Sequence, residues 1–495
     1  MNRLVIIGNG FDMAHGLKTS YKDFINWYWD QRVDAFAGNI KKVSEDCLCK
    51  LSIKDNNDIS CWNVYKCYFS NCDINGNRKL SGYSVVREIQ SNKDLFKVEY
   101  SPLLERIMKS FEDKKWVDIE NDYYQLLKNC IENADCGYTA EQLNEQLDYL
   151  KDRLVEYLRT LPKSNTLSRI EYAIKEDIHI VDLSRKGKTL AKTIDDSIKI
   201  DFNRFDEGRY ESERINGLPP EHTMLLCFNY TDTAWMYELL GGTILYYIHG
   251  YLGHPEHIIF GYGDELDKDY PTIRDKNDNE LLKNVKSVKY LETSNYSRML
   301  DFIMAAPFQV LIMGHSCGNS DRTLLNTIFE HENCVSIKPY YHQKADGSDN
   351  FLEIVQNISR NFTDMGLYRD RVVDKERCLP MSKTVRCNFI IKVQLGHFPN
   401  VVNCQQPIAV DLTEGQFDHY CETLKHWQIT DEWKSRKVED GENSFIKRDL
   451  PAIYDMIMRI VIEKFPNIWD YDNMLNLDQV HIFTAEEIYS HVGQS

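Results

Sequence analysis

Six short apolar runs, each leading into a glycine or a polar turn, constrain the fold of this chain more than any other feature. The first is Leu4-Val5-Ile6-Ile7, which runs directly into Gly8-Asn9-Gly10. The others are "MLLCFNY" (224–230), "TILYYIHG" (243–250), "HIIFGYG" (257–263), "FQVLIMGHS" (308–316) and "VSIKPYY" (335–341). Runs of this length predict buried strands, and helical stretches separate most of them. We therefore predict an α/β fold with a mostly parallel, Rossmann-like sheet and helices on both faces.

In such a sheet, ligands bind beyond the carboxyl ends of the strands. The turns that would meet there are Gly8-Asn9-Gly10-Phe11-Asp12, Phe228-Asn229-Tyr230-Thr231-Asp232, His249-Gly250, Gly261-Tyr262-Gly263-Asp264 and Gly314-His315-Ser316. We expect the functional site at this edge of the sheet.

The domain organisation follows from changes in composition along the chain. The sheet core is predicted over residues 1–39 and 216–375, interrupted by an Asn-rich and Cys-rich lobe over residues 40–100. Residues 101–215 predict a helical insertion that ends in a charged, linker-like stretch (185–213). Within it Leu143, Leu147, Leu150, Leu154 and Leu158 recur at helical spacing, which indicates packing. Residues 376–495 are predicted to form a C-terminal accessory region.

Composition excludes several classes of protein. A formal net charge of −17 argues against a protein that coats a nucleic-acid backbone, and no apolar run approaches the ~18 residues of a membrane helix. "MNRLVIIGNG" is too short for a signal peptide, so we expect a cytoplasmic protein with mostly free thiols. The spacing of Cys47, Cys49, Cys61, Cys67 and Cys72 fits no paired C-x2-C pattern, and no zinc is expected.

The segment Gly314-His315-Ser316-Cys317-Gly318 spells the G-x-S-x-G turn of serine hydrolases. In that interpretation Ser316 is the nucleophile, His249–Gly253 forms the oxyanion segment, and Asp364 or Asp374 and His397 complete a triad. A nucleophile elbow, however, passes directly into its helix. Here the capping cluster Asn319-Ser320-Asp321 comes several residues later, which favours Ser316 as a hydrogen-bonding ligand and Asp321 as a helix cap.

Two resemblances extend this interpretation. The ordered series Gly8-Asn9-Gly10, Asn229 with Asp232, His249-Gly250 and Gly314-His315-Ser316 resembles the sirtuin-like NAD-binding domain, without its paired-cysteine zinc module. The segments "LVIIGNGFDMAHGLKTSYKDF", "WVDIENDYYQLL", "FNYTDT", "YIHGYL", "FGYGDE" and "MGHSCGNSDRTLL" resemble the bacteriophage abortive-infection AbiH family over residues 1–371. This resemblance implies a bacterial cytosolic protein that limits phage spread by harming or arresting the infected cell.

The sirtuin-like resemblance implies NAD as substrate or ligand, and an NAD glycohydrolase-like enzyme that cleaves the bond between nicotinamide and ribose. Asn229 would hold the ribose or the attacking water, His249 would act as base, and Asp232 completes the predicted catalytic set. The predicted NAD-binding residues are Gly8, Asn9, Gly10, Phe11, Asp12, His15, Gly250, Gly314, His315 and Ser316. Gly8, Asn9 and Gly10 would cradle the diphosphate and Asp12 a ribose hydroxyl. We consider a phage-derived trigger and further copies of the same chain as partners, and we expect no membrane partner.

Other interpretations stay open on the sequence alone. A Mg²⁺-dependent nuclease would use Asp118, Glu120, Asp264 and Glu265, and a non-catalytic sensor would bind the nucleotide without cleaving it. His249 is otherwise a turn histidine, and Thr231 or Asp232 otherwise starts a helix. Asp118 and Glu120 otherwise face solvent or pair with Lys114 and Lys115.

Overall fold

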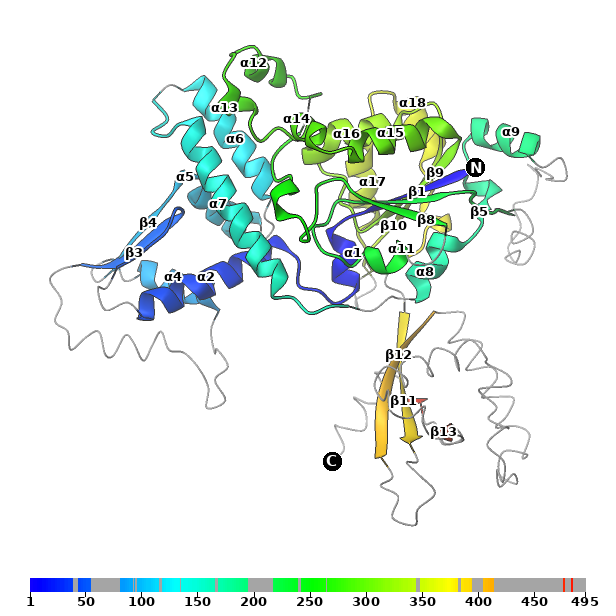
Figure 1. The fold of residues 1–495 in the computed structure, drawn as a ribbon, viewed down its shortest axis with the longest axis horizontal. Coiled ribbons are helices and arrows are strands. Elements are labelled where there is room, and N and C mark those ends of the chain that lie inside the picture. Colours follow the sequence, from blue (N-terminus) through cyan, green and yellow to red (C-terminus); the bar gives the residue numbers. More distant parts are fainter. Residues whose placement is uncertain are drawn as a thin grey trace. The chain divides into compact units, whose positions relative to one another are not determined.

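The computed structural model describes residues 1–38, 43–54, 81–91, 93, 96–114, 118–133, 135–164, 168–194, 217–238, 242–263, 265–343, 348–381, 384–393, 404–413, 475–476 and 482–483. Two compact units make up the chain: Met1–Asn165 with Lys175–Met381, and Thr166–Ile174 with Ser382–Ser495. The first unit contains the sheet that the apolar runs predict, and Figure 1 shows its elements.

The fold is α/β, as predicted, and the central sheet, expected to be mostly parallel, has parallel strands throughout. Its strands, in spatial order, are β10 (Cys334–Tyr340), β9 (Phe308–Met313), β1 (Asn2–Ile7), β7 (Thr223–Cys227) and β8 (Thr243–Tyr247). All four neighbouring pairs are parallel. The carboxyl ends are level, because Ile7 is in register with Cys227 on one side and with Met313 on the other. The turns that follow these strands therefore begin at one edge of the sheet.

Helices cover the sheet because its strands are apolar on both faces. Among the described residues of the first unit, the helices are α1 (Asn9–Ala14), α2 (Tyr21–Gly38), α4 (Gly82–Ser91), α5 (Pro102–Lys114), α6 (Ile119–Glu132), α7 (Ala140–Arg159), α9 (Arg185–Ile194), α11 (Trp235–Glu238), α12 (Tyr270–Arg274), α13 (Asn279–Leu282), α14 (Lys286–Lys289), α15 (Asn295–Ala305), α16 (Arg322–Phe329), α17 (Phe351–Arg360) and α18 (Met365–Arg371). Leu4 and Ile6 of β1 share a buried cluster with residues of α15, α16 and α17. At the amino end of the other face, Met1 and Val335 pack with Ala191 of α9.

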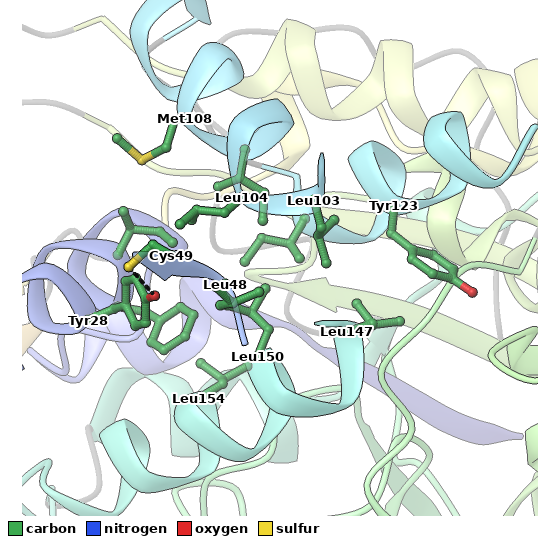
Figure 2. Close-up of a cluster of buried hydrophobic side chains, with 14 of the residues drawn as sticks. Tyr28, Leu48, Cys49, Leu103, Leu104, Met108, Tyr123, Leu147, Leu150 and Leu154 are labelled. Carbon is green, nitrogen blue, oxygen red and sulfur yellow. Dashed lines mark hydrogen bonds between the residues drawn. The ribbon is translucent and has the colours of Figure 1, made fainter. Parts of the chain in front are cut away.

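The helical insertion, the lobe and α2 share a second buried core. In the described part of the lobe, an antiparallel sheet is formed by β2 (Val43–Glu45), β3 (Cys49–Ile53) and β4 (Phe96–Tyr100). Figure 2 shows Leu150 and Leu154 of α7 facing the region of Leu48, Leu103 and Leu104. All five predicted leucines of α7 are buried, so the packing role expected from their spacing is confirmed. This core crosses the predicted boundaries at residues 39 and 100.

Two local expectations are wrong. The run 257–263 is not a strand of the sheet: η2 (Pro255–His257) begins it, and only an isolated bridge joins Tyr262 to Val285. Its backbone groups are bound elsewhere, with Ile259 N donating to His249 O and Gly263 N donating to Ser320 O. The linker-like stretch predicted over residues 185–213 begins with a helix, α9, and its part from residue 195 on lies outside the described residues.

Other short elements lie in the described part of the first unit. They are β5 (Ile178–His179), β6 (Gly217–Leu218), η1 (Ile180–Asp182), η3 (Tyr290–Glu292), η4 (Asn319–Asp321) and η5 (Lys375–Arg377). The second unit contains most of α8 (Ser168–Lys175), and its strands are β11 (Thr384–Val393), β12 (Cys404–Thr413), β13 (Leu475–Asn476) and β14 (Ile482–Phe483). β11 pairs antiparallel with the other three strands.

Candidate functional site

The turns after β1 and β9 touch backbone to backbone. Gly10 N donates to Gly314 O at 2.8 Å, and Gly314 has a φ of +74°, a conformation that favours glycine. A Cβ on Gly8 would lie 2.4 Å from His315 Cα, and one on Gly10 would lie 2.9 Å from Gly314 Cα. These glycines therefore let two loops pack closely. The N–H of Gly10 is already bound to Gly314 O in this contact. The binding of a diphosphate by the Gly8-Asn9-Gly10 turn stays a prediction.

Asn229 ties the end of β7 to the same turn. Its Nδ2 donates to Gly8 O at 2.9 Å, and the residue is 8% exposed. Nearby, Thr231 Oγ1 donates to Asp12 Oδ2 at 2.6 Å, and burial raises the pKa of Asp12 to about 6. Thr231 thus holds a buried carboxyl group, and neither it nor Asp232 starts a helix, because α11 begins at Trp235.

Three other predicted site residues, His15, Asn9 and Asp232, lie around α1 or on the surface. His15 Nδ1 contacts Phe11 O at 2.7 Å and His15 Nε2 contacts the Tyr237 hydroxyl at 2.6 Å, which fixes the ring against α11. Asn9 is exposed and accepts a hydrogen bond from Thr19. Asp232 is exposed, with Lys163 Nζ 4.0 Å from its carboxylate. The edge of the sheet therefore has polar groups on the surface above a buried polar layer.

The most concentrated chemistry is a buried ionic cluster that joins distant segments. Lys286 Nζ donates to Glu120 Oε2 at 2.9 Å and to Asp321 Oδ1 at 2.8 Å, and the lysine side chain is 1% exposed. Glu120 Oε1 also accepts from Gly261 N at 3.2 Å. A charge taken out of water this completely is costly unless it is paired, so the three groups depend on one another.

Two histidines extend this cluster toward the strand ends. His249 Nε2 lies 3.2 Å from Asp321 Oδ1 and 3.1 Å from the Tyr290 hydroxyl. His315 Nδ1 accepts from Cys317 N at 3.0 Å, which places its proton on Nε2, 3.6 Å from Asp321 Oδ2. Asp321 is thus shared by a lysine and two imidazoles.

The electrostatics of the cluster follow from burial and from Lys286. Burial raises the pKa of Glu120 to about 7, although Lys286 opposes this shift. Burial acts in the same direction on Asp321, but Lys286 and His249 outweigh it and hold the pKa of that carboxyl well below its usual range. Burial, reinforced by the Lys286 ammonium, lowers the pKa of His249 to about 4. At neutral pH the cluster therefore contains ionised Asp321, protonated Lys286 and neutral His249.

The position of Asp321 corrects one expectation. It occupies the residue before α16, as the sequence indicates, but its side chain makes no capping hydrogen bond. The carboxylate instead faces Lys286 and His249. The capping role expected of it is therefore wrong, because the ion pair takes the oxygens that a cap would use.

Asp118 and Glu120 also differ from their simplest interpretation. Asp118 caps α6 by accepting from Asn121 N at 3.1 Å, and Glu120 is buried against Lys286 rather than facing solvent. The side chains of Lys114 and Lys115 lie outside the described residues. Asp264 does so too, and Glu265 is exposed. Within the described part of the chain, no group of acidic, histidine and cysteine side chains is arranged to hold a metal ion.

Ser316 does not sit on a nucleophile elbow. Its side chain is exposed, and α16 begins only at Arg322, after η4. Among the proposed triad partners, Asp364 caps α18 and Asp374 pairs with Arg377, while His397 lies outside the described residues. The geometry agrees with the sequence argument that Ser316 is not an activated serine.

Sequence reasoning missed Lys286 and Tyr290 altogether. Lys286 lies in "NVKSVKY", which has the composition of an exposed segment, and no local pattern marks it as buried. The segment is held by Asn144, whose Nδ2 donates to Glu280 O at 2.9 Å and whose Oδ1 accepts from Asn284 Nδ2 at 3.0 Å. Only the tertiary packing of α7 against residues 280–286 identifies the lysine.

Comparison with known proteins identifies the family. The model of the bacteriophage abortive infection AbiH family matches residues 4–342, about two thirds of the chain. No curated protein and no solved structure matches. Among the residues described, no helix combines the length and apolar character that crossing a membrane requires. The chain therefore belongs to the bacteriophage abortive infection AbiH family, and this membership implies a role in phage abortive infection.

Proposed function

We propose that the protein acts in phage abortive infection as a cytoplasmic, phage-triggered enzyme that hydrolyses NAD, or a related nucleotide, at the bond between nicotinamide and ribose. The reaction takes place at the carboxyl edge of the parallel sheet. His249 is the base, Asp321 orients it, and Asn229 and the turns after β1 and β9 position the nucleotide.

The observation that carries this proposal is the pairing of His249 with Asp321. An ionised carboxylate 3.2 Å from Nε2 keeps the imidazole proton on that nitrogen. Among the described residues, none forms a hydrogen bond with Nδ1, so a lone pair is left for a substrate or a water. A base held by a carboxylate in this way is the arrangement that hydrolytic enzymes use.

The strand order supports a nucleotide at this edge. The chain passes from β1 to β7 and β8 on one side, then returns to β9 and β10 on the other, so the order reverses between β1 and β9. In doubly wound sheets the ligand lies at such a reversal. Gly8, Gly10 and Gly314 meet there, which supports the Rossmann-like and sirtuin-like interpretation of the core.

The proposed reaction needs only a weak base at His249. The C–N bond to nicotinamide breaks first, its electron pair leaves with the neutral ring, and an oxocarbenium-like ribose forms. Water then adds to the ribose carbon and gives one proton to Nδ1 of His249. Because the ribose carbon that water attacks is cationic, a weak base with a pKa of about 4 is sufficient to take the proton. Asp321 stabilises the imidazolium while it exists.

The test is to incubate the purified full-length protein with NAD and follow free nicotinamide and ADP-ribose, with and without phage lysate. We expect release in the wild type, and at least a hundredfold loss in Asn229→Ala, His249→Ala and Asp321→Asn. His222→Ala is the matched control, because His222 is exposed at the opposite end of β7. Thermal unfolding of each variant separates lost chemistry from lost folding. The variant His249→Gln serves the same purpose, because it removes the imidazole and retains a polar side chain.

The absence of release under all conditions would overturn the proposal. Binding of NAD without cleavage would then identify a nucleotide sensor. Digestion of nucleic acid that requires Mg²⁺ would instead identify a nuclease, and oligomeric state measured with and without NAD would show whether copies of the chain assemble.

A further inference from the structure

A pocket of about 230 Å³ lies beside the carboxyl end of β8. It is lined by the strand itself, by the turn that follows it, and by the segment before α15. The lining residues are Leu245, Tyr246, Tyr247, Gly250, Tyr251, His254, His257, Thr293, Ser294 and Asn295. Its volume is below the ~300 Å³ at which sites for drug-sized ligands begin, so it has room for one ring system.

The walls of the pocket are fixed by specific contacts. Gly250 has a φ of +77°, and a Cβ there would lie 2.4 Å from His257 O, so η2 closes tightly against this glycine. On the other side, Asn295 Nδ2 donates to Tyr247 O at 2.8 Å and joins the start of α15 to the end of β8. The pocket is therefore built from three segments that hold one another.

The chemistry of the lining selects a class of ligand. No described lining residue is a lysine, arginine, aspartate or glutamate, which argues against a phosphate or a metal ion. The rings of Tyr247 and Tyr251 are stacked with centroids 4.9 Å apart, and His254 meets Tyr251 edge-on at 5.5 Å. Aromatic faces with imidazole and hydroxyl groups around them suit a flat, uncharged, nitrogen-containing ring.

The pocket is connected to the cluster at the sheet edge. Gly250 follows His249 in the chain, and the His249 ring is parallel to Tyr290 at 6.1 Å, which in turn stacks on Tyr296 at 5.4 Å. Tyr296 follows Asn295 of the pocket. We propose that this pocket holds the planar heterocycle of the nucleotide, either its nicotinamide or its adenine ring. This inference rests on the proposed function, because it assigns a second part of the same substrate.

The test measures binding apart from cleavage, by calorimetry on the full-length protein. NAD, nicotinamide mononucleotide, AMP and ribose 5-phosphate are titrated separately. We expect NAD and one mononucleotide to bind, which identifies the ring, and ribose 5-phosphate not to bind. Loss of a stacking partner weakens the binding of a base by about 5- to 150-fold, so Tyr251→Ala should weaken NAD binding about fivefold or more, and Tyr251→Phe less than twofold.

The matched control is Tyr83→Ala, which removes a half-buried tyrosine from an edge contact with Phe111 in the other core. Equal NAD affinity in Tyr251→Ala and wild type would overturn the pocket, as would the absence of NAD binding by the wild type. If Tyr251→Ala weakens NAD binding but the wild type releases no nicotinamide, the pocket is supported and the proposed cleavage is contradicted. If the wild type cleaves NAD and Tyr251→Ala does so with an unchanged KM, the cleavage is supported and the pocket is contradicted.

Discussion

Glu120 accepts a hydrogen bond from Lys286 at 2.9 Å, and the two side chains are only 9% and 1% exposed. Glu120 lies on α6 of the helical insertion, whereas Lys286 starts α14, close to the edge of the sheet. The insertion therefore does more than pack, because it supplies one of the two carboxyl groups that accept hydrogen bonds from the buried ammonium.

Replacing Lys286 by methionine is expected to destabilise the protein by about 3–5 kcal/mol, because Glu120 and Asp321 would remain buried without their cation. The free energy of unfolding in urea is the measurement. Lys289→Met is the matched control, since Lys289 pairs with Glu292 at the surface and its replacement should change stability by less than about 0.5 kcal/mol. Equal effects of the two substitutions would contradict the paired cluster.

Gly8→Ala is expected to cost about 3 kcal/mol or to prevent folding, because its Cβ would overlap the backbone of His315. Gly318→Ala tests the same loop without the overlap. The nearest atom to its Cβ is Ser316 Oγ at 3.6 Å, and its φ of −70° suits alanine. Thermal unfolding should separate the two variants. A Gly8→Ala protein as stable as Gly318→Ala would show that the two turns do not touch.

Asp12→Asn is expected to stabilise the protein at neutral pH. Burial raises the pKa of Asp12 from its ordinary 3.8 to about 6, so the folded state holds a proton that the unfolded state releases. Between about pH 4 and 6 the contribution of Asp12 to stability therefore falls as pH rises, by at most about 3 kcal/mol. Urea unfolding across pH 4–8 should show Asp12→Asn more stable than wild type above pH 6 and similar below pH 4. The exposed Asp301→Asn should follow the wild type throughout.

His249 is expected to stay neutral down to about pH 4, because burial and the Lys286 ammonium lower its pKa. The unfolded chain takes up a proton near the ordinary value of 6.5, so this histidine's contribution to stability is lost as pH falls from about 6.5 to 4. Nuclear magnetic resonance of histidine-labelled protein, with His249→Gln for assignment, would follow the ring directly. A midpoint near 6.5 would mean that the imidazole is not buried beside Lys286.

The sequence predicted the strands far better than the buried cluster. The five strands of the central sheet are short apolar runs, and this local pattern favours a buried strand over other structures. Their order in the chain predicts that their carboxyl ends lie at one edge of the sheet. The run 257–263 has the same composition, but its backbone groups find partners in neighbouring loops, which no local pattern encodes.

The site was predicted in part for a similar reason. His249 and Asn229 follow strands, so the topology places them at one edge. Lys286 and Glu120 come from segments whose position depends on how α6 and α7 dock, and a charged residue in a polar stretch is normally exposed. Asp321 shows the limit most clearly: its position before α16 was evident, but the direction of its side chain was not.

The central position of β1 has a consequence for synthesis. Leu4 pairs with Met224 on one side and with Val310 on the other. β1 therefore has no neighbouring strand to pair with until β7 has been synthesised, and its second neighbour, β9, comes later still. The buried ionic cluster is completed later still, since Asp321 is the last of its members in the chain. A nascent chain that stops short of Asp321 therefore lacks the complete cluster.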